Sequence, residues 1–306
     1  MLVDKGLFED FREGSIQKAQ KEDVIVVGAG IMGATIGRAL RDKGRKVFIL
    51  DADLPFSGTG ACGGLVKPTP LTGLEKNQIK TALAQLDSVY GLTTVKMTIR
   101  PSMNILKADI FQVPMDKVFR TEKNYGKLID LDLKSSPPKV VYQGKKGVWE
   151  KSCDLLILAT GLGSRELFPH LFQKGMIYGK KGVSFIFSGT IEVPFVKIWA
   201  PYKQVTVHNF LYQGTPAIWT GDGSARLIEN WDHLIPVAAL KRIKTAMERN
   251  DNPIATIFGH RSFHKKRKPC YLEKIGNQTW IATGAGKFGC LAAGWAAGEI
   301  IKNELE

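Results

Sequence analysis

Two glycine-rich turns, each placed between an apolar strand and a helix, constrain this chain most strongly. The first, Gly28 to Gly33, follows the β-branched run 23–27, and the second, Gly284 to Gly289, follows the apolar run 280–283. A β-branched run suits a buried parallel strand. A turn with the spacing GxGxxG then brings backbone N–H groups at a helix N-terminus close to a pyrophosphate. Two such turns, about one domain apart, predict one long dinucleotide gripped from two sides.

Asp51 ends the second predicted strand, 46–50, and lies 23 residues after Gly28. That spacing is close to the roughly 20 residues expected for the acid that binds a ribose hydroxyl. An acid there argues against a ribose 2′-phosphate and so against NADP, while NAD and FAD both stay open. The alternative is a glycine-rich turn that binds nothing. The residues predicted to contact the cofactor here are Gly28, Gly30, Ile31, Met32, Gly33, Asp51 and Ala52.

Further motifs follow in order along the chain. They are a small-residue loop at 57–65, an apolar strand ending in Ala-Thr-Gly at 154–161, a Gly-His-Arg-Ser segment at 259–262, and the second glycine turn. In this combination the chain resembles the D-amino-acid oxidase/glycine oxidase family of FAD enzymes over most of residues 23–302. The resemblance implies an α/β fold, with a Rossmann-like FAD-binding domain and a smaller antiparallel-sheet substrate domain. It also implies FAD bound without a covalent link.

The resemblance implies cofactor contacts at the matching positions. The small-residue loop resembles one that runs past the pyrophosphate and flavin, and the Ala-Thr-Gly turn one beside the cofactor. The second glycine turn resembles one that faces the pyrimidine end of the flavin, where a helix N-terminus stabilises negative charge. The matching residues are Gly58, Thr59, Gly60, Ala61, Cys62, Gly63, Gly64, Leu65, Ala159, Thr160, Gly161, Gly284, Gly286, Lys287, Phe288 and Gly289.

Arg261 resembles the family arginine that pairs with the substrate carboxylate. A guanidinium fork suits a two-point contact with a carboxylate, and a structural ion pair is its alternative role. Lys287 lies where relatives often carry a basic residue, and is otherwise a solvated loop lysine. A phenol often helps to hold the carboxylate in this family. Tyr178, Tyr202 and Tyr212 are the candidates, and the sequence does not choose among them.

The sequence contains no paired-carboxylate motif, metal-ligand spacing or nucleophile elbow, so no metal site is predicted. That fits flavin chemistry, in which the cofactor carries the redox step and the protein supplies position and electrostatics. The implied reaction oxidises an amine to an imine, which water hydrolyses. Arg261 or Lys287 would favour the unprotonated amine by like-charge repulsion. Four scattered cysteines, no apolar leader and no long apolar run favour a cytoplasmic location and no membrane partner.

Net charge is the unusual part of the composition. The 306 residues include 43 Lys and Arg against 29 Asp and Glu, which gives +14. A solvated basic surface is one interpretation, and a polyanionic partner, most simply nucleic acid, is the other. One basic run follows Arg261, where the family pattern, near RPxxxDxxPxIG, carries an acid. This run is predicted to bind phosphates at the rim of the active site, and consists of His264, Lys265, Lys266, Arg267 and Lys268.

The domains are predicted to be discontinuous. Residues 1–22 form an N-terminal arm or helix. The FAD-binding domain takes 23–85, 126–172 and 258–306, and the substrate domain takes 86–125 and 173–257. Helices are expected at 31–43, 72–90 and 234–249, and a hairpin is expected to turn at 144–147.

Three functions fit these observations. The leading one is FAD-dependent oxidation of a glycine-like or secondary amine carried on a modified base in DNA or tRNA, releasing glyoxylate. The resemblance supplies precedents, namely tRNA carboxymethylaminomethyl-uridine oxidation and phage thymine hypermodification. The second is an oxidase of free glycine, D-amino acids or sarcosine that produces hydrogen peroxide. The third is a non-catalytic flavin-binding protein.

Overall fold

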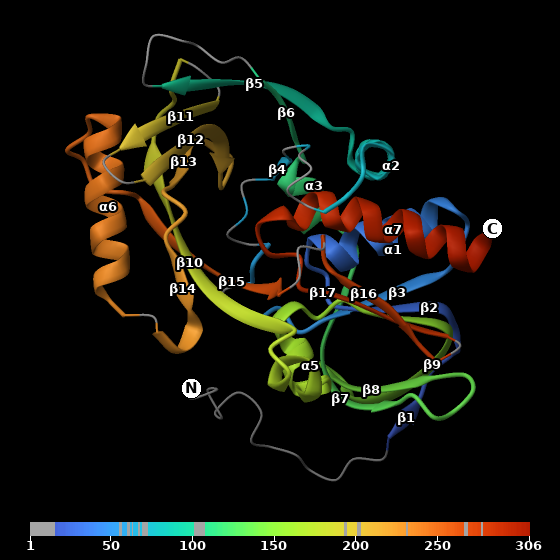
Figure 1. Ribbon diagram of the computed structural model, residues 1–306. Coiled ribbons are helices and arrows are strands. Elements are labelled where there is room, and N and C mark those ends of the chain that lie inside the picture. Colours follow the sequence, from blue (N-terminus) through green and yellow to red (C-terminus); the bar gives the residue numbers. More distant parts are fainter. Residues whose placement is uncertain are drawn as a thin grey trace.

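The computed structural model describes residues 16–54, 57–59, 62, 64–66, 68, 73–100, 108–192, 195–200, 203–230, 232–265, 269–276 and 278–306. These residues form two sheets, and the long strands β10 (Ile177–Ser188) and β15 (Ala255–His264) of the second sheet reach toward the first (Figure 1). Within the described residues, no helix is both long and apolar enough to cross a membrane.

The first sheet has the strand order β16-β17-β9-β2-β3-β7-β8, and β1 pairs with β9 outside this path. Its centre is parallel, since β17, β9, β2, β3 and β7 pair in that sense. The strand before the first glycine turn, β2, and the strand after the helix that follows it, β3, both lie in this parallel part, as the sequence predicts. The strands are β1 (Gln17–Lys18), β2 (Glu22–Val27), β3 (Val47–Asp51), β7 (Asn124–Asp132), β8 (Lys139–Gly144), β9 (Gly147–Leu158), β16 (Tyr271–Ile275) and β17 (Thr279–Thr283).

Three helices cover one face of this sheet: α1 (Ile31–Asp42), α2 (Lys76–Tyr90) and α7 (Gly289–Leu305). Their apolar faces join strands β2, β3, β9 and β17 in one buried core. A Cβ on Gly294 of α7 would overlap the carbonyl of Ala82 in α2, so the two helices touch backbone to backbone. Helix α2 begins at Lys76 rather than 72 because Glu75 and Gln78 form a capping box there.

Strands β7, β8 and the first half of β9 pair as an antiparallel meander, with the predicted turn between Gly144 and Gly147, while the second half of β9 pairs with β2. The meander lies on the side of the parallel strands away from α1 and α7 (Figure 1). Two short helices, α4 (Ser164–Leu167) and α5 (Pro169–Gln173), follow the Ala-Thr-Gly turn. A second buried core, which includes Tyr142, Leu156 and Phe168, fills the space between them. Helix α3 (Met115–Phe119) precedes β7.

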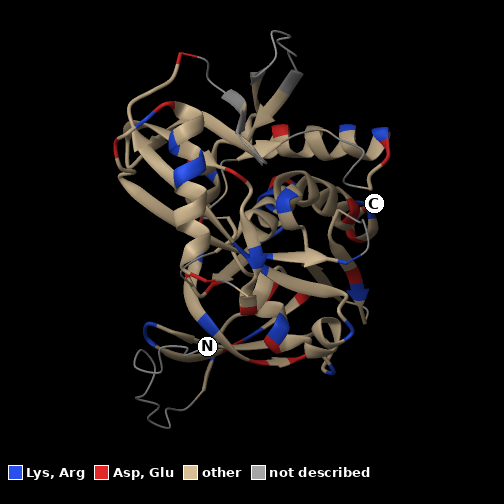
Figure 2. Ribbon diagram, turned by 60° about the vertical axis from the view of Figure 1, so that its left-hand side comes forward, with Lys and Arg blue, Asp and Glu red and all other residues tan. Residues whose placement is uncertain are grey.

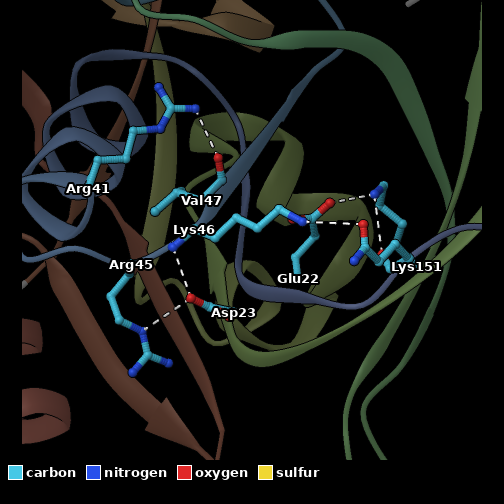
Figure 3. Close-up of polar contacts among 8 residues, drawn as sticks. Glu22, Asp23, Arg41, Arg45, Lys46, Val47 and Lys151 are labelled. Atoms are coloured by element: carbon cyan, nitrogen blue, oxygen red, sulfur yellow. Dashed lines mark hydrogen bonds and ion pairs between the residues drawn. The ribbon is translucent and has the colours of Figure 1, made fainter.

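An ion-pair network ties the start of β2 to its neighbours (Figure 3). The Lys151 Nζ lies 2.6 Å from the Glu22 Oε1, and both side chains are about nine-tenths buried. The Lys46 Nζ lies 3.5 Å from the other Glu22 oxygen. The main-chain N–H of Lys46 donates to Asp23 at 2.9 Å. These contacts join β2, β3 and β9 at the end of the sheet away from the glycine turns.

The second sheet has the strand order β14-β10-β13-β12-β11-β5-β6-β4, with β15 pairing to β10. It is antiparallel except that β5 and β11 pair in parallel, an exception to the expected pattern. Helix α6 (Leu234–Met247) packs on it. The strands are β4 (Leu65–Val66), β5 (Thr93–Arg100), β6 (Ala108–Gln112), β10 (Ile177–Ser188), β11 (Phe195–Ala200), β12 (Lys203–Tyr212), β13 (Thr215–Gly221), β14 (Ala225–Leu227) and β15 (Ala255–His264).

Strands β10 and β15 connect the part of the molecule built on the first sheet to the part built on the second sheet. They pair without interruption from Ile177 opposite His264 to Ile186 opposite Ala255. The predicted boundary between residues 257 and 258 therefore falls inside one continuous strand. The predicted N-terminal arm or helix also differs in its described part, because Gln17–Lys18 pairs as a strand with Trp149 and Glu150. Neither feature has a local sequence signal, since both depend on partners far along the chain.

Candidate active site

Steric contacts require glycine at two positions of the first glycine turn. Gly28 has φ +101°, and a Cβ there would overlap the Ala159 carbonyl at the end of β9. A Cβ on Gly33 would overlap the Gly28 carbonyl, so α1 starts directly against the turn. Gly30 is the N-cap of α1 and makes no side-chain cap. The first N–H groups of the helix, including those of Met32 and Gly33, lack intrahelical acceptors, which makes this a site for an anion.

Asp51 lies at the end of β3 beside this turn, as predicted. One carboxylate oxygen accepts the N–H of Ala29, and the other accepts the N–H of Asp53 at 2.7 Å. The side chain is half-buried and Ala52 is exposed. A fixed carboxylate next to the helix N-terminus matches the ribose-binding role expected of it.

The small-residue loop folds back onto the start of α1. The buried Thr59 hydroxyl accepts the N–H of Ile31 at 2.8 Å. Gly64 and Leu65 continue into the sheet, where the Val113 N–H donates to the Gly64 carbonyl at 2.8 Å and Leu65 pairs with Gln112. The predicted contacts Gly60, Ala61 and Gly63 lie outside the described residues.

The Ala-Thr-Gly turn joins both glycine turns. The N–H of Ala159 donates to the Val27 carbonyl at 2.8 Å, directly before Gly28. The Thr160 hydroxyl lies 2.9 Å from the Ser164 hydroxyl. The Gly161 carbonyl accepts the Thr283 hydroxyl at 2.9 Å, directly before Gly284. The predicted cofactor residues from three separate segments therefore meet at one edge of the parallel sheet.

The second glycine turn is held against β15. Gly284 has φ +76°, and its N–H donates to the Ser262 hydroxyl at 3.1 Å. A Cβ on Gly286 would lie 2.5 Å from the Phe263 ring. Lys287 and Phe288 complete a short 3-10 turn before α7 begins at Gly289. Lys287 is exposed, with its Nζ 5.2 Å from the centre of the Phe288 ring.

One face of the β10–β15 pair looks onto these loops. Arg261 pairs with Lys180, and Phe263 pairs with Tyr178. Residues two apart on a strand share a face, so these four side chains lie together. The Arg261 Cγ is 3.3 Å from the position of a Cβ on Gly58, and Phe263 lies against Gly286. The face carrying Arg261 and Lys180 is thus turned toward the small-residue loop and the second glycine turn.

This face is cationic and aromatic. The rings of Tyr178 and Phe263 stack with centroids 5.5 Å apart. The Lys180 Nζ lies 5.5 Å from the first ring centre and 5.3 Å from the second. Lys180 thus lies against the aromatic pair, with Arg261 on the same face as its cross-strand partner, and guanidinium and ammonium groups are the side chains that bind carboxylates in proteins. The sequence missed Lys180 because only the register of β10 against β15 brings it opposite Arg261.

The structure separates the tyrosine candidates. Tyr178 shares the face of Arg261. Tyr212 closes the β12–β13 turn, beyond the position where β13 meets Ser188. Ser188 lies eight residues from Lys180 on β10, or about 26 Å along the strand. Tyr212 is therefore not brought to this site, and Tyr202 lies outside the described residues.

The predicted phosphate-binding run begins at the end of β15. His264 is half-buried, with its ring stacked near Tyr271 at a centroid distance of 5.9 Å. Lys265 is exposed, and its N–H donates to the Met176 carbonyl at 2.8 Å. Lys266, Arg267 and Lys268 lie outside the described residues. Among the residues the structure does describe, no group of three or more His, Cys, Asp or Glu side chains could hold a metal ion.

The residues of this edge fit FAD. The glycines at positions 28, 30 and 33 leave the N-terminus of α1 accessible. A Cβ on Gly30 would lie 3.0 Å from the Thr59 hydroxyl and narrow the approach to this helix end. The helix N-terminus and Asp51 match a pyrophosphate and a ribose, and the second glycine turn offers another helix N-terminus opposite. Cys270 is buried in the apolar core, which raises the pKa of its thiol to about 12 and does not suit a covalent flavin link.

Comparison with known proteins agrees with this assignment. A family model described as FAD dependent oxidoreductase, DAO, matches residues 23–98. Squalene epoxidase of Schizosaccharomyces pombe is 38% identical over 71 residues, which is 23% of this chain but only 15% of that protein's length. The chain thus shares only a short segment with that curated relative.

Solved structures resemble the whole chain. Glycine oxidase from Bacillus cereus has a TM-score of 0.66 at 15% identity, covering 94% of this chain and 96% of that one. L-proline dehydrogenase from P. horikoshii has a TM-score of 0.65 at 14% identity, covering 94% and 95%. At these identities the likeness shows the fold, which is the glycine oxidase-like fold predicted from the motifs. Residues 23–98 therefore match the FAD dependent oxidoreductase family model, and the chain as a whole shares the fold of these enzymes.

Proposed function

We propose that this protein uses FAD to oxidise a glycine-like or secondary amine bearing a carboxylate, and that the amine is carried on a modified base in nucleic acid. The observation that carries the amine part is the side chain of Arg261, packed beside Gly58 of the small-residue loop with Lys180 directly opposite. A substrate carboxylate bound there would hold its carbon chain between the two glycine turns.

The residues of the chain divide the work by position. The N-terminus of α1 and Asp51 bind the pyrophosphate and ribose of the cofactor. Arg261 forms the two-point contact with the substrate carboxylate, and Lys180 adds charge from the facing strand. Their positive charges also favour the neutral amine over its protonated form. FAD, when bound, accepts the two electrons that the substrate loses.

The proposed overall reaction balances with water as co-substrate. The amine R–NH–CH2–COO⁻ loses two electrons and two protons from its N–H and α-C–H, giving the imine R–N=CH–COO⁻. Water adds to the imine carbon, and the C–N bond breaks. The products are R–NH2 and glyoxylate, with the oxygen of glyoxylate's aldehyde supplied by water.

Net charge supports the nucleic-acid part of the proposal. The chain carries +14, and FAD offsets only about two of these charges through its pyrophosphate. Lys and Arg residues are distributed over both lobes, including α6 (Figure 2). Near the site, Lys180 and Lys181 lie on β10 and Lys265 follows β15. A base that bears the amine would need to leave a duplex stack to reach Arg261.

Oxidation of a free amino acid or sarcosine is the second candidate. The short cationic face of Arg261 and Lys180 is sufficient for a single carboxylate and requires no polymer. The two candidates differ in what the remaining basic residues do. Only a nucleic-acid substrate gives them a role and makes turnover depend on salt.

The test mixes the FAD-loaded protein anaerobically with three substrates. They are free glycine, DNA containing glycyl-modified thymidine, and tRNA containing carboxymethylaminomethyl-uridine. Bleaching of the flavin by a nucleic-acid substrate, weakened when salt is raised from 50 to 200 mM (about tenfold or more for several phosphate contacts), supports the proposal. Bleaching by free glycine alone, unchanged by salt, overturns the nucleic-acid part. No bleaching by any amine overturns both.

A further inference from the structure

Two cysteines far apart in sequence meet between the glycine turns. Cys62 lies in the small-residue loop, and Cys290 is the second residue of α7. Their Sγ atoms are 3.9 Å apart, although 228 residues separate them. Cys62 is partly exposed, while Cys290 is only 3% exposed. Cys62 is thus the more exposed residue of the pair.

The surroundings make the two sulfurs chemically unequal. The Cys290 thiol hydrogen-bonds to the Cys62 sulfur, the Gly64 N–H donates to it at 3.4 Å, and the charge of Arg261 acts on it. Together these lower the pKa of Cys62 to about 6, while the same contact raises the pKa of Cys290. The contact therefore favours the thiolate on Cys62 and the neutral thiol on Cys290. A thiolate is the form of cysteine that reacts.

The other two cysteines provide an internal contrast. Cys153 and Cys270 are buried, and desolvation raises the pKa of each thiol to about 12. For Cys153 the charge of Lys21 does not offset the burial, and for Cys270 burial is the one cause of the shift. Buried neutral thiols of this kind are inert.

We propose that Cys62 and Cys290 form an oxidant-sensitive thiol pair, in which a hydroperoxide oxidises Cys62 and Cys290 then closes a disulfide with it. The Cys62 thiolate attacks one peroxide oxygen, the O–O bond breaks, and hydrogen peroxide leaves one water and a sulfenic acid on Cys62. The Cys290 sulfur displaces the sulfenic oxygen as a second water. In total two thiols lose two electrons, and one peroxide gains them.

The geometry suits this closure. A disulfide requires the sulfurs to approach from 3.9 Å to about 2.05 Å. The bond would join the loop that supplies Thr59, which caps α1, to the N-terminus of α7. It would therefore link the two walls of the cofactor site.

The test treats the FAD-loaded protein with one equivalent of hydrogen peroxide and maps its cysteines by alkylation and peptide mass spectrometry. The expected product is a linked peptide pair containing Cys62 and Cys290, with Cys153 and Cys270 still alkylated. In Cys290→Ser, dimedone should trap a sulfenic acid on Cys62. In the wild type, alkylation of Cys62 by iodoacetamide should begin at a clearly lower pH than alkylation of Cys153.

Cys153→Ser is the matched control and should leave the linked peptide unchanged, while FAD content and circular dichroism report whether each variant folds. The proposal is overturned if peroxide gives no Cys62–Cys290 peptide in folded protein, or if Cys62 reacts with iodoacetamide no faster than Cys153. Because these readouts need no amine turnover, they are independent of the proposed reaction.

Discussion

Arg261 and Lys180 are direct cross-strand partners on β15 and β10, on the face that carries Tyr178 and Phe263. Lys181, one residue further on, pairs with His260 on the opposite face and lies 4.8 Å from the Phe258 ring centre. Alternation along one strand therefore places one lysine inside the candidate site and its neighbour outside it.

Removing the charge of Lys180 should weaken substrate binding. In Lys180→Met, which keeps the apolar stem, kcat/KM for the amine substrate should fall about five- to tenfold through a higher KM. In Arg261→Ala, kcat/KM should fall about ten- to a hundredfold, as expected for the loss of one charge-assisted contact. Lys181→Met is the matched control, with kcat/KM for a small free amine unchanged. Equal losses of kcat/KM in Lys180→Met and Lys181→Met would contradict the assignment of Lys180, and not Lys181, to the site.

Gly30→Ala should impair FAD binding without unfolding the protein. Its Cβ would lie 3.0 Å from the Thr59 hydroxyl and narrow the approach to the N-terminus of α1. We expect the FAD dissociation constant to rise at least tenfold, or about 1.4 kcal/mol, by fluorescence titration. Gly298→Ala in α7, whose Cβ would meet Thr81 at an ordinary 3.6 Å, should bind FAD normally. Wild-type affinity in Gly30→Ala would place the pyrophosphate elsewhere.

Removing one partner of the Glu22–Lys151 pair should lower the free energy of unfolding more than removing both partners. Lys151→Met leaves a buried carboxylate with Lys46 at 3.5 Å as its remaining ion-pair partner. We expect a loss of about 3 kcal/mol in urea unfolding. The double variant Glu22→Leu/Lys151→Met should lose less than this single variant. If the losses of unfolding free energy in Glu22→Leu and Lys151→Met add up to the loss in the double variant, the two side chains are not coupled.

His208 should make stability depend on pH. Desolvation lowers the pKa of this buried ring to about 4, against about 6.5 in an unfolded chain. Between these values the unfolded chain binds a proton that the folded protein does not, so stability falls as the pH falls. From pH 7.5 to 4.5 the wild type should lose about 2.5 kcal/mol more than His208→Gln in urea unfolding. The exposed His233→Gln should behave like the wild type, and parallel pH profiles for wild type and His208→Gln would contradict the assignment.

Local patterns predicted much of this architecture. The two glycine turns, the strands that precede them and the hairpin at 144–147 depend on neighbours in sequence, and the structure has all of them. Register between distant strands left no local signal. The pairing of Lys180 with Arg261, the parallel contact of β5 with β11 and the approach of Cys62 to Cys290 arise only when segments far apart in the chain pack together. The sequence also could not choose Tyr178 over Tyr212, because no local pattern shows which strand pairs with β15.

The most direct test of the account is an anaerobic single turnover of the FAD-loaded protein with an N-carboxymethyl amine, measuring flavin bleaching and glyoxylate together. One glyoxylate should form for each flavin bleached, with both slowed in parallel in Arg261→Ala at a fixed, limiting substrate concentration. A flavin that no carboxylate-bearing amine bleaches, or bleaching without glyoxylate, would contradict it.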